Sequence, residues 1–182
     1  MSSRLKVLYI CLLSTLFVSC KHKETQVQQH LKEFIGNEII IPDSLLIFNN
    51  GDTITANSIL SSRCKLVIFI DSASCSTCRI KTLLFKGSFI YDFVRENCNI
   101  MVVFDMKDIY YLEVAFQKYG LKIPFFVDLK SEFKKYNKIP KEEILRIFLL
   151  YDNKVVLAGD PMDNRVLQRL YKKQILRLTK EE

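Results

Sequence analysis

The sequence predicts an α/β domain in which a mixed central sheet is flanked by helices. Two segments, 65–71 and 99–105, are nearly continuous apolar runs, which is typical of parallel strands buried on both faces. Helical patterns alternate with them, and two further strand patterns meet at Asp152-Asn153, as in a hairpin. This order of elements indicates a mixed sheet with helices on both faces. With 182 residues, 49% of them hydrophobic, the chain is expected to form one domain with a sizeable core.

The first 19 residues read as a signal peptide. Arg4 and Lys6 precede an apolar run, residues 7–18, that is too short to span a bilayer. The ending Phe17-Val18-Ser19-Cys20 resembles the lipobox of bacterial lipoproteins. That resemblance implies cleavage before Cys20 and a lipid anchor on it, with residues 20–26 as a tether. The alternative is a signal processed in another way, or not at all, which would leave Cys20 as an ordinary thiol.

An N-terminal amphipathic helix and linker are expected over residues 27–43, ahead of the main domain at 44–182. Val27, Leu31, Phe34 and Ile35 recur at helical spacing, and Gly36-Asn37 ends the pattern. Residues 44–48 then read as a strand, 49–52 as a tight turn and 53–54 as a return strand. We therefore expect a helix and a hairpin in front of the main sheet.

The remaining elements alternate in the way that an α/β sheet requires. A helix is expected from the dithiol to about residue 96, and a second helix is capped by Asp108 and ends at Gly120. Residues 125–128 read as a third strand, and 146–151 with 154–158 as a hairpin. The last helix is expected after Asp163, with these residues on its inner face: Val166, Leu167, Leu170, Tyr171 and Ile175.

Cys75 and Cys78 are the candidate catalytic residues. They follow a buried strand and open a helix, where unsatisfied amides and the helix dipole stabilise a thiolate. The spacing lets Cys78 attack a mixed disulfide held by Cys75, so the pair can cycle between dithiol and disulfide. Cys75 is the expected nucleophile and Cys78 the resolving thiol. We expect no cofactor apart from this redox-active disulfide.

Over residues 44–178 or so, the chain resembles the thioredoxin-like family, in particular envelope-tethered oxidoreductases similar to TlpA and ResA. The resemblance is carried by Cys75-Ser76-Thr77-Cys78-Arg79 after a strand, by residues 125–128 and by residues 148–156. It implies a thioredoxin-like fold and a membrane-tethered thiol-disulfide oxidoreductase. Protein or peptide thiols would be its clients, with a separate electron donor. It further implies a lipid-anchored protein of the bacterial cell envelope, facing the periplasm.

The surroundings of the dithiol differ from the family pattern. Ser74 stands where a Trp is usual, and the place of the family's cis-proline falls on Leu145, with Pro140 as the nearest proline. These two residues, with Ser74, Ser76 and Thr77, are the expected substrate contacts. Phe69 occupies the place of a buried acid, so Asp71 is the candidate proton acceptor, although Asp71 also fits a cap or loop role. These departures leave an alternative open, a thioredoxin-fold binding or scaffold lipoprotein whose disulfide does not cycle.

The other cysteines and the charge exclude several classes of function. Cys64 and Cys98 each directly precede an expected parallel strand, and these strands should be neighbours, so the two cysteines form either a structural disulfide or two buried thiols. A zinc site is not expected, because the strand 65–71 separates Cys64 from Cys75 by roughly 23 Å. The net charge of +7 comes without a basic block interleaved with aromatic residues, so no nucleic-acid partner is expected.

Overall fold

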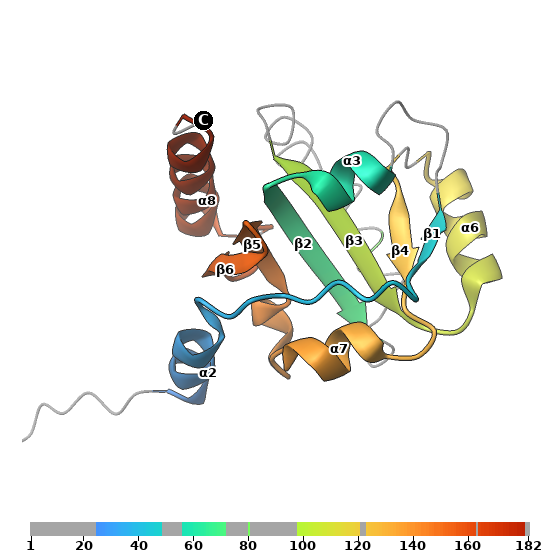
Figure 1. Cartoon of the computed structure of the whole chain (residues 1–182), viewed down its shortest axis with the longest axis horizontal. Coiled ribbons are helices and arrows are strands. Elements are labelled where there is room, and N and C mark those ends of the chain that lie inside the picture. Colours follow the sequence, from blue (N-terminus) through green and yellow to red (C-terminus); the bar gives the residue numbers. More distant parts are fainter. Residues whose placement is uncertain are drawn as a thin grey trace, which may run out of the picture.

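The computed structural model describes residues 25–48, 56–71, 80, 98–120, 123–162 and 164–180. Within them the chain forms a six-stranded mixed sheet with helices on both faces, which confirms the predicted fold class (Figure 1). The strands lie in the order β1-β4-β3-β2-β5-β6. No helix of the described residues combines the length and the apolar character needed to cross a membrane.

Three parallel strands form the middle of the sheet. They are β2 (Cys64–Asp71), β3 (Asn99–Asp105) and β4 (Phe125–Val127), and nearly every residue in them is buried. Lys65 pairs with Asn99 at one end of β2 and Asp71 with Asp105 at the other. Because the strands run in parallel and in register, their carboxyl ends meet at one edge of the sheet.

Antiparallel strands complete the sheet on both sides. The hairpin of β5 (Ile147–Tyr151) and β6 (Lys154–Ala158) lies as predicted, with Asp152 at φ 49° and Asn153 at φ 61°. Both residues tolerate the left-handed conformation that a two-residue turn of this type requires. On the other side, β1 (Leu46–Phe48) pairs with β4. The turn and return strand expected after β1 lie outside the described residues.

The helices divide between the two faces of the sheet. The core on one face includes buried residues of α6 (Ile109–Lys118) and α8 (Arg165–Thr179). The core on the other includes residues of α2 (Gln26–Phe34), α3 (Ala56–Ser61) and α7 (Glu132–Asn137). The polar stretch after β4 therefore contains a helix, α7, that periodicity did not predict, because only Phe133 and Asn137 of its six residues are buried.

The last helix differs from its prediction in the face that it buries. Its N-cap is Asn164, whose side chain accepts from the amides of Val166 and Leu167. Tyr171, Ile175 and Leu178 are buried, but Val166 is 65% exposed and Leu170 46%. Their assignment to the inner face was wrong, because the helix buries a narrower stripe than the apolar pattern suggests.

The N-terminal helix is present and is attached to the sheet by the segment that follows it. Thr25 and Gln28 form a capping box at the start of α2, and Phe34 packs edge-on against Phe148 with ring centroids 5.1 Å apart. After the helix, the Gly36 amide donates to the Val155 carbonyl (2.8 Å), and the Val155 amide donates to the Asn37 carbonyl (2.9 Å). The segment thus extends the sheet beyond β6.

Candidate functional site

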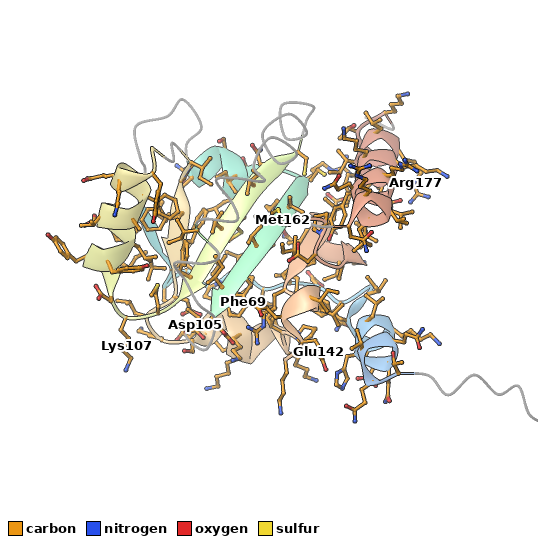
Figure 2. The ribbon with its side chains drawn as sticks, turned by 180° about the vertical axis from the view of Figure 1, so that it is seen from behind. Phe69, Asp105, Lys107, Glu142, Met162 and Arg177 are labelled. Atoms are coloured by element: carbon orange, nitrogen blue, oxygen red, sulfur yellow. The ribbon has the colours of Figure 1, made fainter. Side chains whose placement is uncertain are left out.

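Two carboxylates lie side by side where the central parallel strands end. Asp71 closes β2 and Asp105 closes β3, and the two residues are direct partners in the register. Their exposed fractions are only 2% and 7%. Figure 2 shows Asp105 and Phe69 at this same end of the sheet. Open α/β sheets place their sites at this edge, so the buried charges are candidates for a functional role.

Asp71 is paired with cations from two other elements. The Arg146 Nη1 atom lies 2.9 Å from its Oδ1, and the Lys134 Nζ atom lies 3.2 Å from its Oδ2. Lys134 comes from α7, and Arg146 directly precedes β5. A buried carboxylate needs such partners to offset the loss of hydration. Two cations at this distance also favour its ionised form.

Arg146 holds the chain before β5 against the end of β2. Its carbonyl accepts from the Phe69 amide (2.9 Å), which extends the pairing of β2 with β5 by one residue. Its side chain donates to the carbonyls of Lys141 (2.8 Å) and Pro140 (3.5 Å). One side chain therefore links Asp71, the 140–141 segment and the start of β5.

Sequence reasoning missed both cations. Arg146 stands between Leu145 and Ile147 at the start of a buried strand, and a charged residue in that setting signals a buried partner. That signal was available. Lys134 had none, because it is one of several lysines in a polar stretch and only the position of α7 brings it to Asp71.

The neighbouring carboxylates fix the start of α7. The Asp105 carboxylate accepts from the Ser131 hydroxyl (2.6 Å). Asp128 accepts from the amides of Glu132 (3.1 Å) and Phe133 (2.7 Å), and so caps the helix from outside its first turn. These contacts set the direction of α7 and place Lys134 over the carboxyl edge.

The predicted substrate contacts that the structure describes lie on the segment before β5. Leu145 is buried, in a short 3₁₀ helix (Glu143–Leu145). Pro140 lines a cleft of about 470 Å³ between α2 and residues 138–141. Neither residue follows a cis peptide bond. Cys75, Cys78, Ser74, Ser76 and Thr77, like the lipidation candidate Cys20, lie outside the described residues.

The amino ends of the same strands carry the other two cysteines and a buried lysine. Cys64 and Cys98 are buried thiols and form no disulfide in the structure. A hydrogen bond to Cys64 and burial together raise the pKa of the Cys98 thiol well above its ordinary value. The possible disulfide is thus replaced here by a thiol pair, the second of the two arrangements that the sequence allowed.

Lys65 lies beside this pair and is 2% exposed. Its ammonium donates to the Ser62 carbonyl and to Asn153 Oδ1 (3.0 Å). Desolvation lowers the pKa of Lys65 below its ordinary value, against the opposing pull of Asp152. Among the described residues, no group of three or more His, Cys, Asp or Glu side chains is arranged to hold a metal ion.

No protein-family model and no curated sequence matches the chain. Solved structures do. A putative protein disulfide isomerase from Bacteroides thetaiotaomicron aligns with a TM-score of 0.54 at 16% identity, over 80% of this chain and 90% of its own. The structure of a PrxQ mutant from Xylella fastidiosa aligns with a TM-score of 0.53 at 17% identity, over 77% of this chain and 96% of its own.

A third match extends the same pattern. A putative thiol:disulfide interchange protein DsbE from Chlorobium tepidum gives a TM-score of 0.51 at 13% identity, over 76% of this chain and 96% of its own. Identities this low bear on the fold alone. The sheet order, the helices on both faces and these alignments agree, and the chain has a thioredoxin-like fold.

Proposed function

We propose that this protein is a membrane-tethered thiol-disulfide oxidoreductase that acts on protein or peptide thiols through Cys75 and Cys78. The observation that supports it best is the place of the dithiol in the chain. Cys75 follows Asp71 by four residues, and four residues reach at most about 14 Å. This short distance along the chain supports a dithiol site at the carboxyl edge of the sheet, within reach of the buried ion pairs of Asp71.

The reaction is a pair of thiol-disulfide exchanges. The Cys75 thiolate attacks a client disulfide, so that a Cys75–client disulfide forms and one client thiolate leaves. The Cys78 thiolate then attacks the Cys75 sulfur and releases the second client thiolate. The client gains two electrons, and Cys75 and Cys78 become a disulfide that an external dithiol donor reduces. In the oxidising direction the same steps run in reverse.

The ion pairs at Asp71 suggest how the site supports this chemistry. A carboxylate already bound by Arg146 and Lys134 is a weaker proton acceptor than a lone one. We therefore assign Asp71 first to positioning, since it fixes two cations at the edge where the dithiol segment begins. Cations near a cysteine favour its thiolate, the form that attacks. Proton transfer from Cys78 to Asp71, directly or through water, remains part of the proposal.

The tether is proposed on the N-terminal sequence alone. Cys20 would carry the lipid, and only four residues lie between it and Thr25, the cap of α2. This would hold the domain close to the envelope membrane, facing the periplasm.

The experiment traps the intermediate in cells. In a Cys78→Ser variant the Cys75–client disulfide cannot be resolved, so acid-quenched samples should show adducts that reductant dissolves and that fractionate with membranes. The matched Cys75→Ser variant should show none. Equal adducts in both variants would reject Cys75 as the nucleophile. A Cys75–Cys78 bridge with a potential below about −300 mV that never turns over would instead favour the scaffold alternative.

A further inference from the structure

The outer face of α8 is strongly basic. Residues 165–180 contain six cations and no acid: Arg165, Arg169, Lys172, Lys173, Arg177 and Lys180. All six are exposed. Even with Glu181 and Glu182 counted, the end of the chain keeps a clear positive charge. We call these six residues, together with the apolar ones described next, the α8 face.

Apolar side chains are interspersed among the cations. Val166 is 65% exposed, Leu170 46% and Leu176 41%. At 100° per residue, Val166 and Leu176 fall within the arc of the cations and Leu170 lies at its margin, on the side away from Tyr171 and Ile175 in the core. The helix thus has two different faces. An apolar stripe packs in the protein core, and a face of mixed cationic and aliphatic residues is directed outward.

In the described part of the chain, acidic partners do not neutralise four of the six cations of this face. Arg165, Arg169, Lys173 and Arg177 form no ion pair with any acidic residue among those the structure describes. Figure 2 shows Arg177 on the outer side of the helix, away from the sheet. The face therefore presents a concentrated positive field to whatever lies beside it.

The position of α8 relative to the proposed tether narrows the choice of partner. Figure 1 shows α8 and α2 at the same end of the molecule, with α6 at the opposite end. The chain reaches at most about 18 Å from Cys20 to Thr25. A lipid on Cys20 would thus bring this end of the domain, rather than the α6 end, to the bilayer. Exposed aliphatic residues among cations suit a lipid surface, in contrast to the aromatic stacking that single-stranded nucleic acid uses.

We propose that the α8 face docks on anionic lipid headgroups and inserts Val166, Leu170 and Leu176 at the acyl boundary. The choice of a membrane rests in part on the proposed tether. The charge and exposure of the α8 face are independent of that tether. Docking would orient the domain, so that the carboxyl edge of the sheet keeps a fixed position relative to the membrane.

The chain contains no tryptophan, so a single introduced one reports on its own surroundings. We would place it in the mature protein, purified from cell membranes, as Leu170→Trp. The control is Tyr110→Trp, at a position 77% exposed on α6. Both proteins are reconstituted into vesicles of phosphatidylglycerol or of phosphatidylcholine. The reporter at position 170 should shift to the blue and be quenched by brominated acyl chains only in phosphatidylglycerol, and 1 M salt should remove the shift. The reporter at 110 should respond to neither lipid.

Charge variants test the cations directly. Arg169→Gln, Lys173→Gln and Arg177→Gln together should lower the docking equilibrium constant roughly 100-fold, about fivefold for each charge removed. Removing three cations elsewhere, by Lys107→Gln, Lys118→Gln and Lys130→Gln, changes the net charge equally and should leave docking intact.

Two results would overturn the proposal. One is the same emission at position 170 in both lipids. The other is a response to an anionic polymer such as polyuridylate without a response to phosphatidylglycerol, which would assign the face to nucleic acid. Redox turnover through Cys75 and Cys78 is measured on the same proteins. If the Leu170→Trp protein shows no docking while its turnover is intact, this inference alone is rejected, whereas absent turnover with docking intact rejects the proposed function alone.

Discussion

The two ends of strand β2 bury opposite charges in opposite ways. At the carboxyl end, Asp71 is 2% exposed and has two cationic partners, one before β5 and one on α7. At the amino end, Lys65 is equally buried, and its two hydrogen-bond acceptors are a carbonyl and an amide oxygen. The direct partners of the Asp71 carboxylate are thus charged, whereas the hydrogen-bond acceptors of the Lys65 ammonium are neutral.

The difference shows where the fold maintains charge. Full countercharges keep a buried group ionised, whereas neutral acceptors only partly offset its desolvation, so the group becomes easier to neutralise. Accordingly, burial lowers the pKa of Lys65, while the hydrogen bond with Cys64 and burial raise the pKa of Cys98 beside it, and both shifts favour neutral forms. The carboxyl end of β2 therefore maintains ionised groups, whereas the amino end favours neutral groups and has a structural role.

The largest effect should come from Arg146→Leu, which removes a cation from the carboxyl end. Breaking a buried ion pair costs about 3–5 kcal/mol, and here the buried Asp71 carboxylate would lose its closer and more buried cation and keep the more exposed Lys134. Chemical denaturation in urea measures the loss. The double variant Asp71→Leu/Arg146→Leu should recover much of it, because no buried carboxylate with too little countercharge remains.

Arg63→Leu is the control at the amino end. Arg63 pairs with Asp152 at 2.7 Å, but both side chains are about half exposed, so its loss should matter far less. If Arg146→Leu and Arg63→Leu cost the same, the contrast between the two ends of β2 is wrong.

How far the sequence predicts this arrangement depends on how local each signal is. The limits of β3, the cap of α6 and the turn at Asp152-Asn153 follow from short patterns, and the structure contains them. The short helix α7 has too few buried residues to show a period, so it was read only as a polar stretch. The pairing of Lys134 with Asp71 joins residues 63 positions apart, and no local pattern contains that information.

Lys65→Met should produce a smaller effect that depends on pH. Because the pKa of Lys65 is lowered by folding, the folded protein releases this proton at a lower pH than the unfolded chain. Stability from this group therefore rises as the pH climbs from the folded pKa towards the ordinary 10.5. In urea unfolding from pH 7 to 10.5, the free energy of unfolding of the wild type should rise relative to that of the variant. Cys98 and Tyr171 also have raised pKa values, the latter through burial, but both are present in both proteins and largely cancel in the difference. A difference independent of pH would contradict the buried-ammonium interpretation.

The last prediction, that reductant does not change the free energy of unfolding, tests the thiol pair of Cys64 and Cys98. With Cys75→Ser and Cys78→Ser both in place, Cys64 and Cys98 are the remaining cysteines of the domain. The raised pKa of Cys98 and the burial of both thiols disfavour the thiolate that disulfide exchange requires, so we expect both to stay reduced even under oxidising conditions. Reductant should then leave the free energy of unfolding unchanged, and alkylation should label both cysteines only in urea. A Cys64–Cys98 bridge would instead make reduction cost roughly 3–4 kcal/mol, because it would close a loop of about 35 residues. That loss, with the matching cross-linked peptide, would show that Cys64 and Cys98 form a structural disulfide instead of a thiol pair.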